Sequence, residues 1–366
     1  MKMNKLNISE NIFRHRKRIG YTQQDLADFL NISKSAVSKW ERGNALPEVN
    51  YLGELGILFD ISIDELVGFS PWLTKQQIRI IYTDLAAKFS AENYDAVLKE
   101  VKDYAKRYYS CYPFLTSLAG LLVNHLSLTE DKEETIACIG ELIERILSNS
   151  DSLHLKEQMI FFKALLLIKE NSHKEVIELL KESTLPKLPV RTVLAQSYLM
   201  NGEAEKAKSA LHIEIYESVI FMMGDLTMLM YFGMEDDIES VISKGTAIDH
   251  AFNLKKLHPN TALNFYLTAA MKTSDVKEKS MFYLKEFLIS VKNLSADYYL
   301  HGDDFFSEID DWIEDFELGK EVPVNKTIAK EQLIAAVEHN ESFKDYKDDI
   351  TFKNILHSLK LYLEAD

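Results

Sequence analysis

A set of hydrogen-bond donors recurs along residues 34–42 at the spacing of one helix face. The side chains are Lys34, Ser35, Ser38, Lys39 and Arg42, and no acidic residue shares that face. Lys can donate to guanine O6 and N7, Ser can address either kind of base edge, and a helix N-terminus can receive a phosphate. These residues could therefore read the major groove of DNA. The alternative is a solvated basic face, since Lys and Ser are common on exposed helices.

Two short helices have to position that face. Thr22 is a good N-cap with Asp25 three residues later, and Tyr21 and Leu26 occupy the two positions of a hydrophobic staple. A helix is therefore predicted to begin at Thr22. It should end at Asn31, because asparagine tolerates a left-handed backbone better than other non-glycine residues.

The second helix repeats these signals. Ser33 is an N-cap, Ile32 can contact Val37 across the first turn, and Gly43 stands where a glycine would end the segment. Val37 and Trp40 form an apolar stripe, which leaves the donors on the other side of the helix. The sequence thus predicts two helices joined by a three-residue turn.

The pattern T-Q-x-x-L-A-x-x-L-x-x-S-x-x-x-V-S-x-W-E-R-G from Thr22 to Gly43, with Pro47 shortly after, resembles the Cro/CI-type (xenobiotic-response-element) helix-turn-helix family. The resemblance implies an all-helical, five-helix DNA-binding domain from about Ile8 to Gly68, in which Lys34 to Arg42 is the recognition helix.

The resemblance also implies roles for single residues. Gln23 resembles the family's phosphate-clamping glutamine, and Arg16 and Glu41 resemble its buried arginine–glutamate pair. The residues that fall on its base- and backbone-contacting positions are Ser33, Lys34, Ser35, Ser38 and Lys39. Arg42 completes the candidate DNA-binding set. Lys and Ser stand where the best-known phage repressors carry glutamines, so no operator sequence can be transferred.

Charge is distributed unevenly along the chain, whose net charge is −15. Residues 1–42 hold nine Lys or Arg and four acidic residues, whereas residues 43–69 hold five acidic residues and no Lys or Arg. The cationic surface is therefore local. An acidic body disfavours general coating of DNA and favours a paired, correctly spaced site.

Composition sets limits on the class of protein. The 366 residues are 46% hydrophobic, with only 13 Gly and 7 Pro, which favours helix throughout two or three domains. No basic N-terminal segment with an apolar run and no stretch of some 18 uncharged apolar residues is present, so a cytoplasmic protein with no membrane partner is expected. Cys111 and Cys138 fit a reducing compartment.

The domain boundary is predicted between residues 69 and 70. A fourth helix should follow Pro47 and reach about Phe59, and a short fifth helix should be capped by Ser62 or Asp64. The residues that break the helical pattern after it are Gly68, Ser70 and Pro71.

Residues 70–366 read as successive helical patterns that alternate in pairs. One segment resembles the tetratricopeptide spacing of small and aromatic residues at Ala195, Tyr198, Gly202, Ala204, Ala207 and Leu211. A weaker copy lies 31 residues earlier, close to the usual period of about 34. We predict a degenerate tetratricopeptide-like α-solenoid; the alternative is an unrelated helical bundle.

A Cro/CI-type domain followed by a helical repeat resembles the Gram-positive regulators whose repeat domain binds a short signalling peptide. Such a domain needs polar side chains on its inner helices to pair with the amides of an extended peptide. The candidate effector-binding residues are Arg191, Gln196, Tyr198, Asn201, Asn264 and Tyr266. The alternative for each is an inter-helix hydrogen bond or a solvated position.

Two further segments stand out. The methionine-rich run Phe221 to Met234 is interpreted mainly as core, with a dimer interface or a ligand pocket as alternatives. The segment Leu300 to Gly319 is predicted to form a helix with an apolar face and an acidic wet side, with Asp303 or Asp304 near its N-terminus. This helix could dock against the array or a second subunit. Its acidic spacing is not that of a calcium loop.

No motif for catalysis, a cofactor or a metal is present. The sequence therefore predicts a sequence-specific transcriptional regulator, not an enzyme, that binds a double-stranded operator as a homodimer through residues 8–68. Its repeat domain would dimerise or bind an effector. Alternatives are a protein–protein interaction scaffold with a DNA-tethering domain and an enzyme with an unrecognised site.

Overall fold

The computed structural model describes residues 7–69, 72–129, 131–184, 188–294, 298–316 and 326–365. Within these ranges all regular secondary structure is helical, which confirms the predicted fold class. The chain divides into two compact units, Met1–Leu73 and Thr74–Asp366. Ser70 and Pro71, which mark the predicted boundary, lie outside the described ranges.

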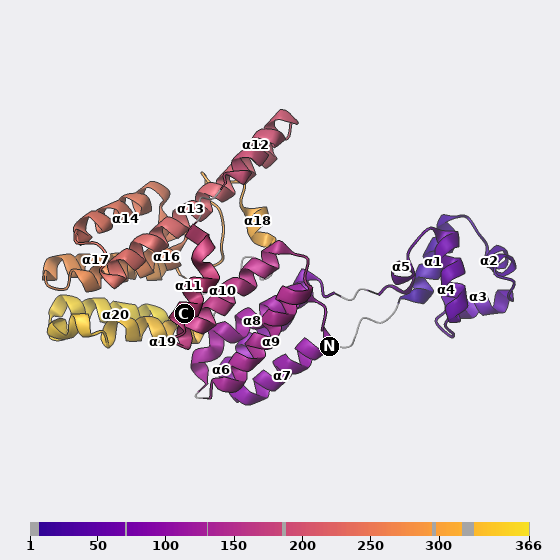
Figure 1. Ribbon diagram of the computed structural model, residues 1–366, viewed down its shortest axis with the longest axis horizontal. Helices are drawn as coiled ribbons and strands as arrows, with labels where there is room; N and C mark the ends of the chain where they lie inside the picture. Colours follow the sequence, from indigo (N-terminus) through magenta and orange to yellow (C-terminus); the bar gives the residue numbers. More distant parts are fainter. Residues whose placement is uncertain are drawn as a thin grey trace. The chain divides into compact units, whose positions relative to one another are not determined.

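The first unit is a five-helix domain in its described part. Its helices are α1 (Ile8–Arg18), α2 (Gln23–Phe29), α3 (Lys34–Glu41), α4 (Val49–Phe59) and α5 (Ile63–Val67) (Figure 1). The core takes Ile12 from α1, Leu26 from α2, Val37 from α3, Leu55 from α4 and Leu66 from α5, each fully buried. Because every helix contributes at least one such side chain, the core fixes α3 relative to the other four.

The second unit is an array of helices. They are α6 (Lys75–Ala91), α7 (Tyr94–Arg107), α8 (Tyr112–His125), α9 (Glu133–Asn149), α10 (Leu153–Lys169), α11 (His173–Leu180), α12 (Val190–Met200), α13 (Ala204–Phe232), α14 (Ile238–Phe252), α15 (Leu254–Leu257), α16 (Pro259–Lys272), α17 (Lys277–Asn293), α18 (Asp310–Glu314), α19 (Lys326–Glu338) and α20 (Ile350–Ala365). Short 3-10 turns cover Leu126–Leu128, Lys181–Thr184 and Glu341–Tyr346. Consecutive helices pack in pairs, among them α6 with α7, α8 with α9, α10 with α11 and α12 with α13.

The α12–α13 pair has the packing that the repeat-like spacing predicts. Ala195, Ala207 and Ala210 are buried together, with Tyr198 packed against them. Small side chains let the two helices approach closely. The second helix of the pair is longer than a repeat unit requires, since α13 runs for 29 residues.

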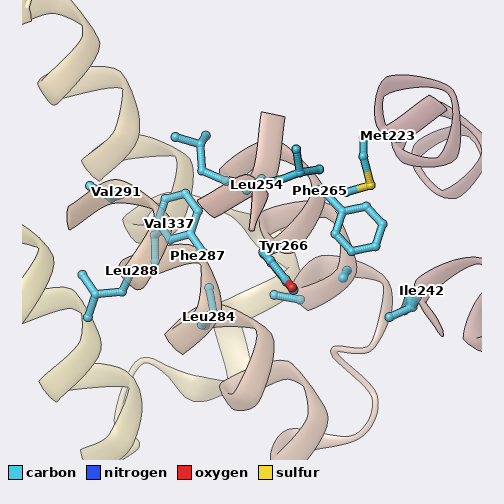
Figure 2. Close-up of a cluster of buried hydrophobic side chains, with 14 of the residues drawn as sticks. Met223, Ile242, Leu254, Phe265, Tyr266, Leu284, Phe287, Leu288, Val291 and Val337 are labelled. Carbon is cyan, nitrogen blue, oxygen red and sulfur yellow. The ribbon is translucent and has the colours of Figure 1, made fainter. Parts of the chain in front are cut away.

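One continuous core joins α13 to the C-terminal helices. Figure 2 shows Met223 of α13, Ile242 of α14, Phe265 of α16 and Phe287 of α17 in this cluster. A Cβ at Gly245 would lie 2.2 Å from the Phe265 ring, so α14 lies this close to α16 only because that residue is glycine.

The methionine-rich run is only partly core. Met223 and Met230 are buried in the cluster, but several other large side chains of the run are exposed to solvent, so the interpretation as mainly core is wrong for them. By length and composition, α13 is also the one described helix that could cross a membrane. Its most apolar stretch is only 22% buried in this structure.

The predicted helix over Leu300–Gly319 is wrong for most of its length. Of the described part, only α18 is helical, and residues 301–309 form an irregular turn. The Asp303 carboxylate accepts the backbone N–H groups of Phe305 and Phe306 at 3.0 and 2.8 Å, and Asp310 accepts that of Gly302 at 2.7 Å. Such side-chain bonds give the backbone an alternative to helix. Residues 317–319 lie outside the described ranges.

The same segment docks against the array, as one of the two predicted alternatives has it. Lys75 of α6 donates to the Asp315 carboxylate at 2.8 Å, and Arg79 pairs with Glu314. On the other side, the Ser209 hydroxyl of α13 donates to the Glu308 carbonyl at 2.7 Å. The segment therefore links the first helix of the second unit to α13.

Candidate DNA-binding surface

The turn between α2 and α3 is set by local hydrogen bonds. The Thr22 hydroxyl accepts the Asp25 N–H, and the Asp25 carboxylate accepts the Thr22 N–H at 2.8 Å, a complete capping box. These bonds from the Thr22 backbone and hydroxyl lower the pKa of the Asp25 carboxyl. Asn31 has φ of 53°, and the Ile32 N–H reaches the Ala27 carbonyl at 2.9 Å. The predicted start and stop of α2 are confirmed.

The start of α3 follows the same rules. The Ser33 hydroxyl accepts the Ala36 N–H at 3.2 Å, and Ser33 keeps extended backbone angles, as an N-cap does. Gly43 has φ of 72°, a left-handed conformation that glycine adopts without strain, directly after the helix. The helix-turn-helix is thus defined at both ends by residues predicted from the sequence.

The two faces of α3 differ in burial and chemistry. Val37 and Trp40 are buried in the core, and the Trp40 ring lies 5.6 Å from that of Tyr51. At about 100° per residue, Lys34, Ser35, Ser38, Lys39 and Arg42 occupy an arc of about 140° on the opposite side. All of them are exposed except Ser38, which is half-buried. The core therefore leaves the predicted donor face outward.

The two lysines of this face are unengaged. Among the described residues, neither Lys34 nor Lys39 has a hydrogen-bond or ion-pair partner. The Arg42 guanidinium, in contrast, donates from Nε to the Ser38 carbonyl at 3.0 Å, which caps the last turn of its own helix. Both lysine ammonium groups can therefore bind an anion without losing a present partner. Arg42 uses only its Nε, so its other N–H groups can also donate.

A buried ion pair anchors α3 to α1. Arg16 donates from Nε and Nη2 to the two Glu41 oxygens at 2.5 and 2.9 Å, and from Nη1 to the Tyr21 carbonyl at 2.6 Å. The Gln23 amide donates to Glu41 at 2.8 Å. The sequence resemblance implied the Arg16–Glu41 pair but not the link to Gln23. Since a side-chain amide carries two N–H groups, Gln23 uses one for Glu41 and keeps the other.

Asn11 is a structural residue that the sequence analysis missed. It is buried in α1, and its amide donates to the carbonyls of Glu65 and Leu66 at 3.0 and 3.2 Å. Arg18 of the same helix donates to the Phe59 carbonyl at the end of α4. A buried Asn satisfying the last carbonyls of a short helix leaves no periodic signal in the sequence.

The candidate effector residues lie in different surroundings. Arg191 pairs with Glu214 and Glu217 of α13, the Asn201 amide donates to Glu203 at 2.5 Å, and the Asn264 amide donates to the Asn260 carbonyl at 2.9 Å. Gln196 is exposed and Tyr198 is half-buried against α13.

Tyr266 requires a correction. Its side chain is fully buried, and its hydroxyl donates to the Asp249 carboxylate at 2.5 Å. Lys255 bonds the same carboxylate at 2.9 Å. Burial, followed by the Asp249 carboxylate, raises the pKa of the Tyr266 hydroxyl. Tyr266 is therefore a core residue and offers no contact to a surface ligand.

The part of the chain that the structure describes contains no group of three His, Cys, Asp or Glu residues placed to hold a metal ion. Cys111 and Cys138 are buried free thiols, and burial raises the pKa of the Cys138 thiol to about 11. A thiol with a raised pKa is a poor nucleophile.

The N-terminal unit is similar in sequence to known proteins. Residues 12–66 match the helix-turn-helix family. The chain is 37% identical over 71 residues to the cryptic phage CTXphi transcriptional repressor RstR of Vibrio cholerae, across 19% of this chain and 62% of RstR. It is 38% identical over 53 residues to the HTH-type transcriptional activator BcrR of Enterococcus faecalis, across 14% of this chain and 26% of BcrR. The matched part thus spans less than two thirds of these two relatives.

A solved structure, the apo form of ComR from S. thermophilus, matches over 80% of this chain and 95% of that one, at 14% identity and a TM-score of 0.28. The HTH-type transcriptional regulator ImmR of Bacillus subtilis is 30% identical over 98 residues, across 27% of this chain and 70% of ImmR. Together with the capped helix-turn-helix and its outward donor face, the match to ImmR shows that the chain belongs to the helix-turn-helix family of transcriptional regulators.

Proposed function

We propose that α3 enters the major groove of a double-stranded operator and reads it with Lys34, Ser35, Ser38 and Lys39. The single observation that carries this proposal is the pair of exposed, unengaged lysines on the face of α3 opposite Val37 and Trp40. Because the opposite face of α3 is buried in the core, the helix has a fixed position in the domain. Its donors can therefore contact base edges in a defined register.

The residues around α3 would position it on the backbone. Gln23 at the first turn of α2 would donate its free amide N–H to a phosphate, and Ser33 would do so at the start of α3. Arg42 would contact the backbone or a base edge with its remaining donors. Such contacts carry orientation, whereas the two lysines carry sequence preference.

The operator would be bound by a homodimer. One short helix contacts too few base pairs to select a site in a genome, and dimers of helix-turn-helix domains read two half-sites about 34 Å apart or a multiple of that spacing. DNase footprinting on the protein's own promoter tests this. We expect two related protected half-sites, and protection of one asymmetric half-site by a monomer would contradict the proposal.

The second unit would act as a receptor for a short peptide. In support, Gln196 and Asn264 are exposed amides on α12 and α16, and an extended peptide needs such groups to pair with its backbone. Arg191 and Asn201 would have to exchange their present partners for the peptide. The ligand would shift DNA binding only by its difference in affinity for two arrangements of the protein.

The receptor proposal is tested by calorimetry of the full chain with short peptides encoded near its gene. Gln196→Ala and Asn264→Ala should weaken binding, while Tyr266→Phe, a change in the core, should not alter a peptide contact. If no peptide binds, or a bound peptide leaves operator affinity unchanged, the alternative of a scaffold with a DNA-tethering domain takes its place.

A further inference from the structure

The C-terminal half of α13 leaves one face uncovered. Six large apolar side chains, five in the helix and Met234 just after its end, are exposed by half or more: Phe221, Met222, Met228, Tyr231, Phe232 and Met234. Phe221 and Phe232 are 62% and 59% exposed, whereas Met223 and Met230 on the other side are fully buried. A core helix would bury its apolar residues, so this second apolar face needs another explanation.

Three of the exposed side chains form a stripe along the helix. Phe221, Met228 and Phe232 are spaced by seven and four residues, which places them in line on one face. Met223 and Met230 lie on the opposite face and pack in the core of the second unit. Figure 2 shows Met223 in this core. The helix therefore has two apolar faces, and the protein's own described core uses one of them.

Gly224 lies within the exposed stripe. A glycine in the interior of a helix is unfavourable compared with alanine, and a Cβ at Gly224 would meet no atom within 4 Å. Nothing within the described chain therefore requires a glycine at this position. A glycine between Phe221 and Met228 does, however, permit a second helix to cross at close range.

The apolar area of this face favours a second copy of the chain as the occupant. Between Ser218 and Met234 the one charged residue is Asp225, which lies four residues after Phe221 on the same face. Aromatic side chains bury about 150–250 Å² each, so the six half-exposed residues offer roughly 600 Å² of apolar surface. A standard interface takes about 800 Å² from each partner, somewhat more than half of it apolar.

We propose that two copies of this chain pair through α13, with the two helices crossing at Gly224 about a two-fold axis. Phe221 of one copy then packs against Met228 of the other, and the same contact repeats on the far side of the axis. The proposal builds on the homodimer of the proposed function and names the surface that forms it. It also explains why a regulator would keep an apolar face exposed in one copy.

Sedimentation equilibrium of the full chain without DNA tests this surface. Met228→Lys should weaken self-association by at least about tenfold, because it places a charge in the centre of the interface. Ile177→Lys is the matched control, since Ile177 of α11 is exposed to a similar degree but lies outside α13. The control should leave self-association unchanged.

Gly224→Ala gives the more specific test, because it should stabilise the helix but weaken the dimer. Alanine favours helix and should raise the melting temperature by about 2 °C when the variant is monomeric. If helices cross at Gly224, the added methyl group should nevertheless weaken the dimer. An alanine variant that dimerises as well as wild type contradicts the crossing point.

Three other outcomes would overturn the proposal. They are a wild-type chain that stays monomeric at roughly 100 μM, a dimer that Met228→Lys leaves intact, and a monomer that floats with neutral phosphatidylcholine vesicles. The last would identify a lipid surface as the occupant of this face. A parallel gel shift with a single half-site tests DNA binding separately from dimerisation. A monomer can still bind one half-site if the DNA-binding proposal holds.

Discussion

Arg16 and Glu41 form a two-bond ion pair between α1 and the last turn of α3, and their side chains are only 3% and 4% exposed. Because Glu41 also accepts from Gln23, the same carboxylate ties α2 to α3. Three of the five helices of the domain therefore depend on one acidic side chain for their relative placement.

Glu41→Ala should destabilise the N-terminal domain by about 3–5 kcal/mol, because it leaves the Arg16 guanidinium buried without a counter-charge. Replacing both partners, as in Arg16→Met with Glu41→Leu, should cost less than that single change. Urea unfolding of the full chain measures both. Lys17→Ala, an exposed cation on the same helix, is the control, and a Glu41→Ala cost no larger than that of Lys17→Ala would contradict the anchoring role.

Ser33→Ala should lower the stability of the domain by about 1 kcal/mol, since the Ser33 hydroxyl accepts the Ala36 N–H at the start of α3. Ser35→Ala removes an exposed hydroxyl at the second residue of the same helix and should change stability little. Chemical unfolding separates the two variants. Equal effects would show that Ser33 does not cap the helix.

The N-terminal domain should lose stability as the pH falls, because its buried His15 disfavours protonation. The imidazole is buried against the Phe59 ring, and burial, followed by the nearby Arg18 and Arg14 charges, lowers its pKa below the usual value of about 6.5. Glu65, at 4.0 Å, opposes this shift. Below pH 6.5 the unfolded chain therefore binds more protons than the folded chain, so stability is complete above that pH and decreases as the pH falls.

His15→Gln should remove this part of the pH dependence. Urea unfolding at pH 7.5 and 5.5 measures the difference, and an NMR titration of the His15 ring gives its pKa directly. A His15 pKa at or above about 6.5 would contradict the account.

The helix-turn-helix could be predicted because its signals are local. Thr22, Asp25, Asn31, Ser33 and Gly43 each set a helix end through bonds or backbone angles within a few residues, and all five act in the structure as the sequence indicates. The buried Arg16–Glu41 pair spans 25 residues and was accessible only through resemblance to a family.

The second unit was harder to predict because burial depends on neighbours that periodicity does not identify. The methionine-rich run was interpreted mainly as core, but its spacing did not indicate that Met223 faces the core and Phe221 faces solvent. Tyr266 was predicted to bind an effector because the sequence pattern does not identify Asp249 of α14 as its hydrogen-bond partner. At Asp303, side-chain bonds to the backbone prevailed over the apolar spacing that predicted a helix.

The most direct test of the central claim is the affinity of Lys34→Ala and Lys39→Ala variants for the operator, measured by fluorescence anisotropy against a scrambled duplex. Lys39→Ala should reduce the preference for the operator by about 1–3 kcal/mol, whereas Gln23→Ala should weaken both duplexes alike. Both lysines are exposed and unengaged, so their loss should leave the fold intact. If both lysine variants bind the operator as tightly and selectively as the wild-type chain, α3 is not the recognition helix.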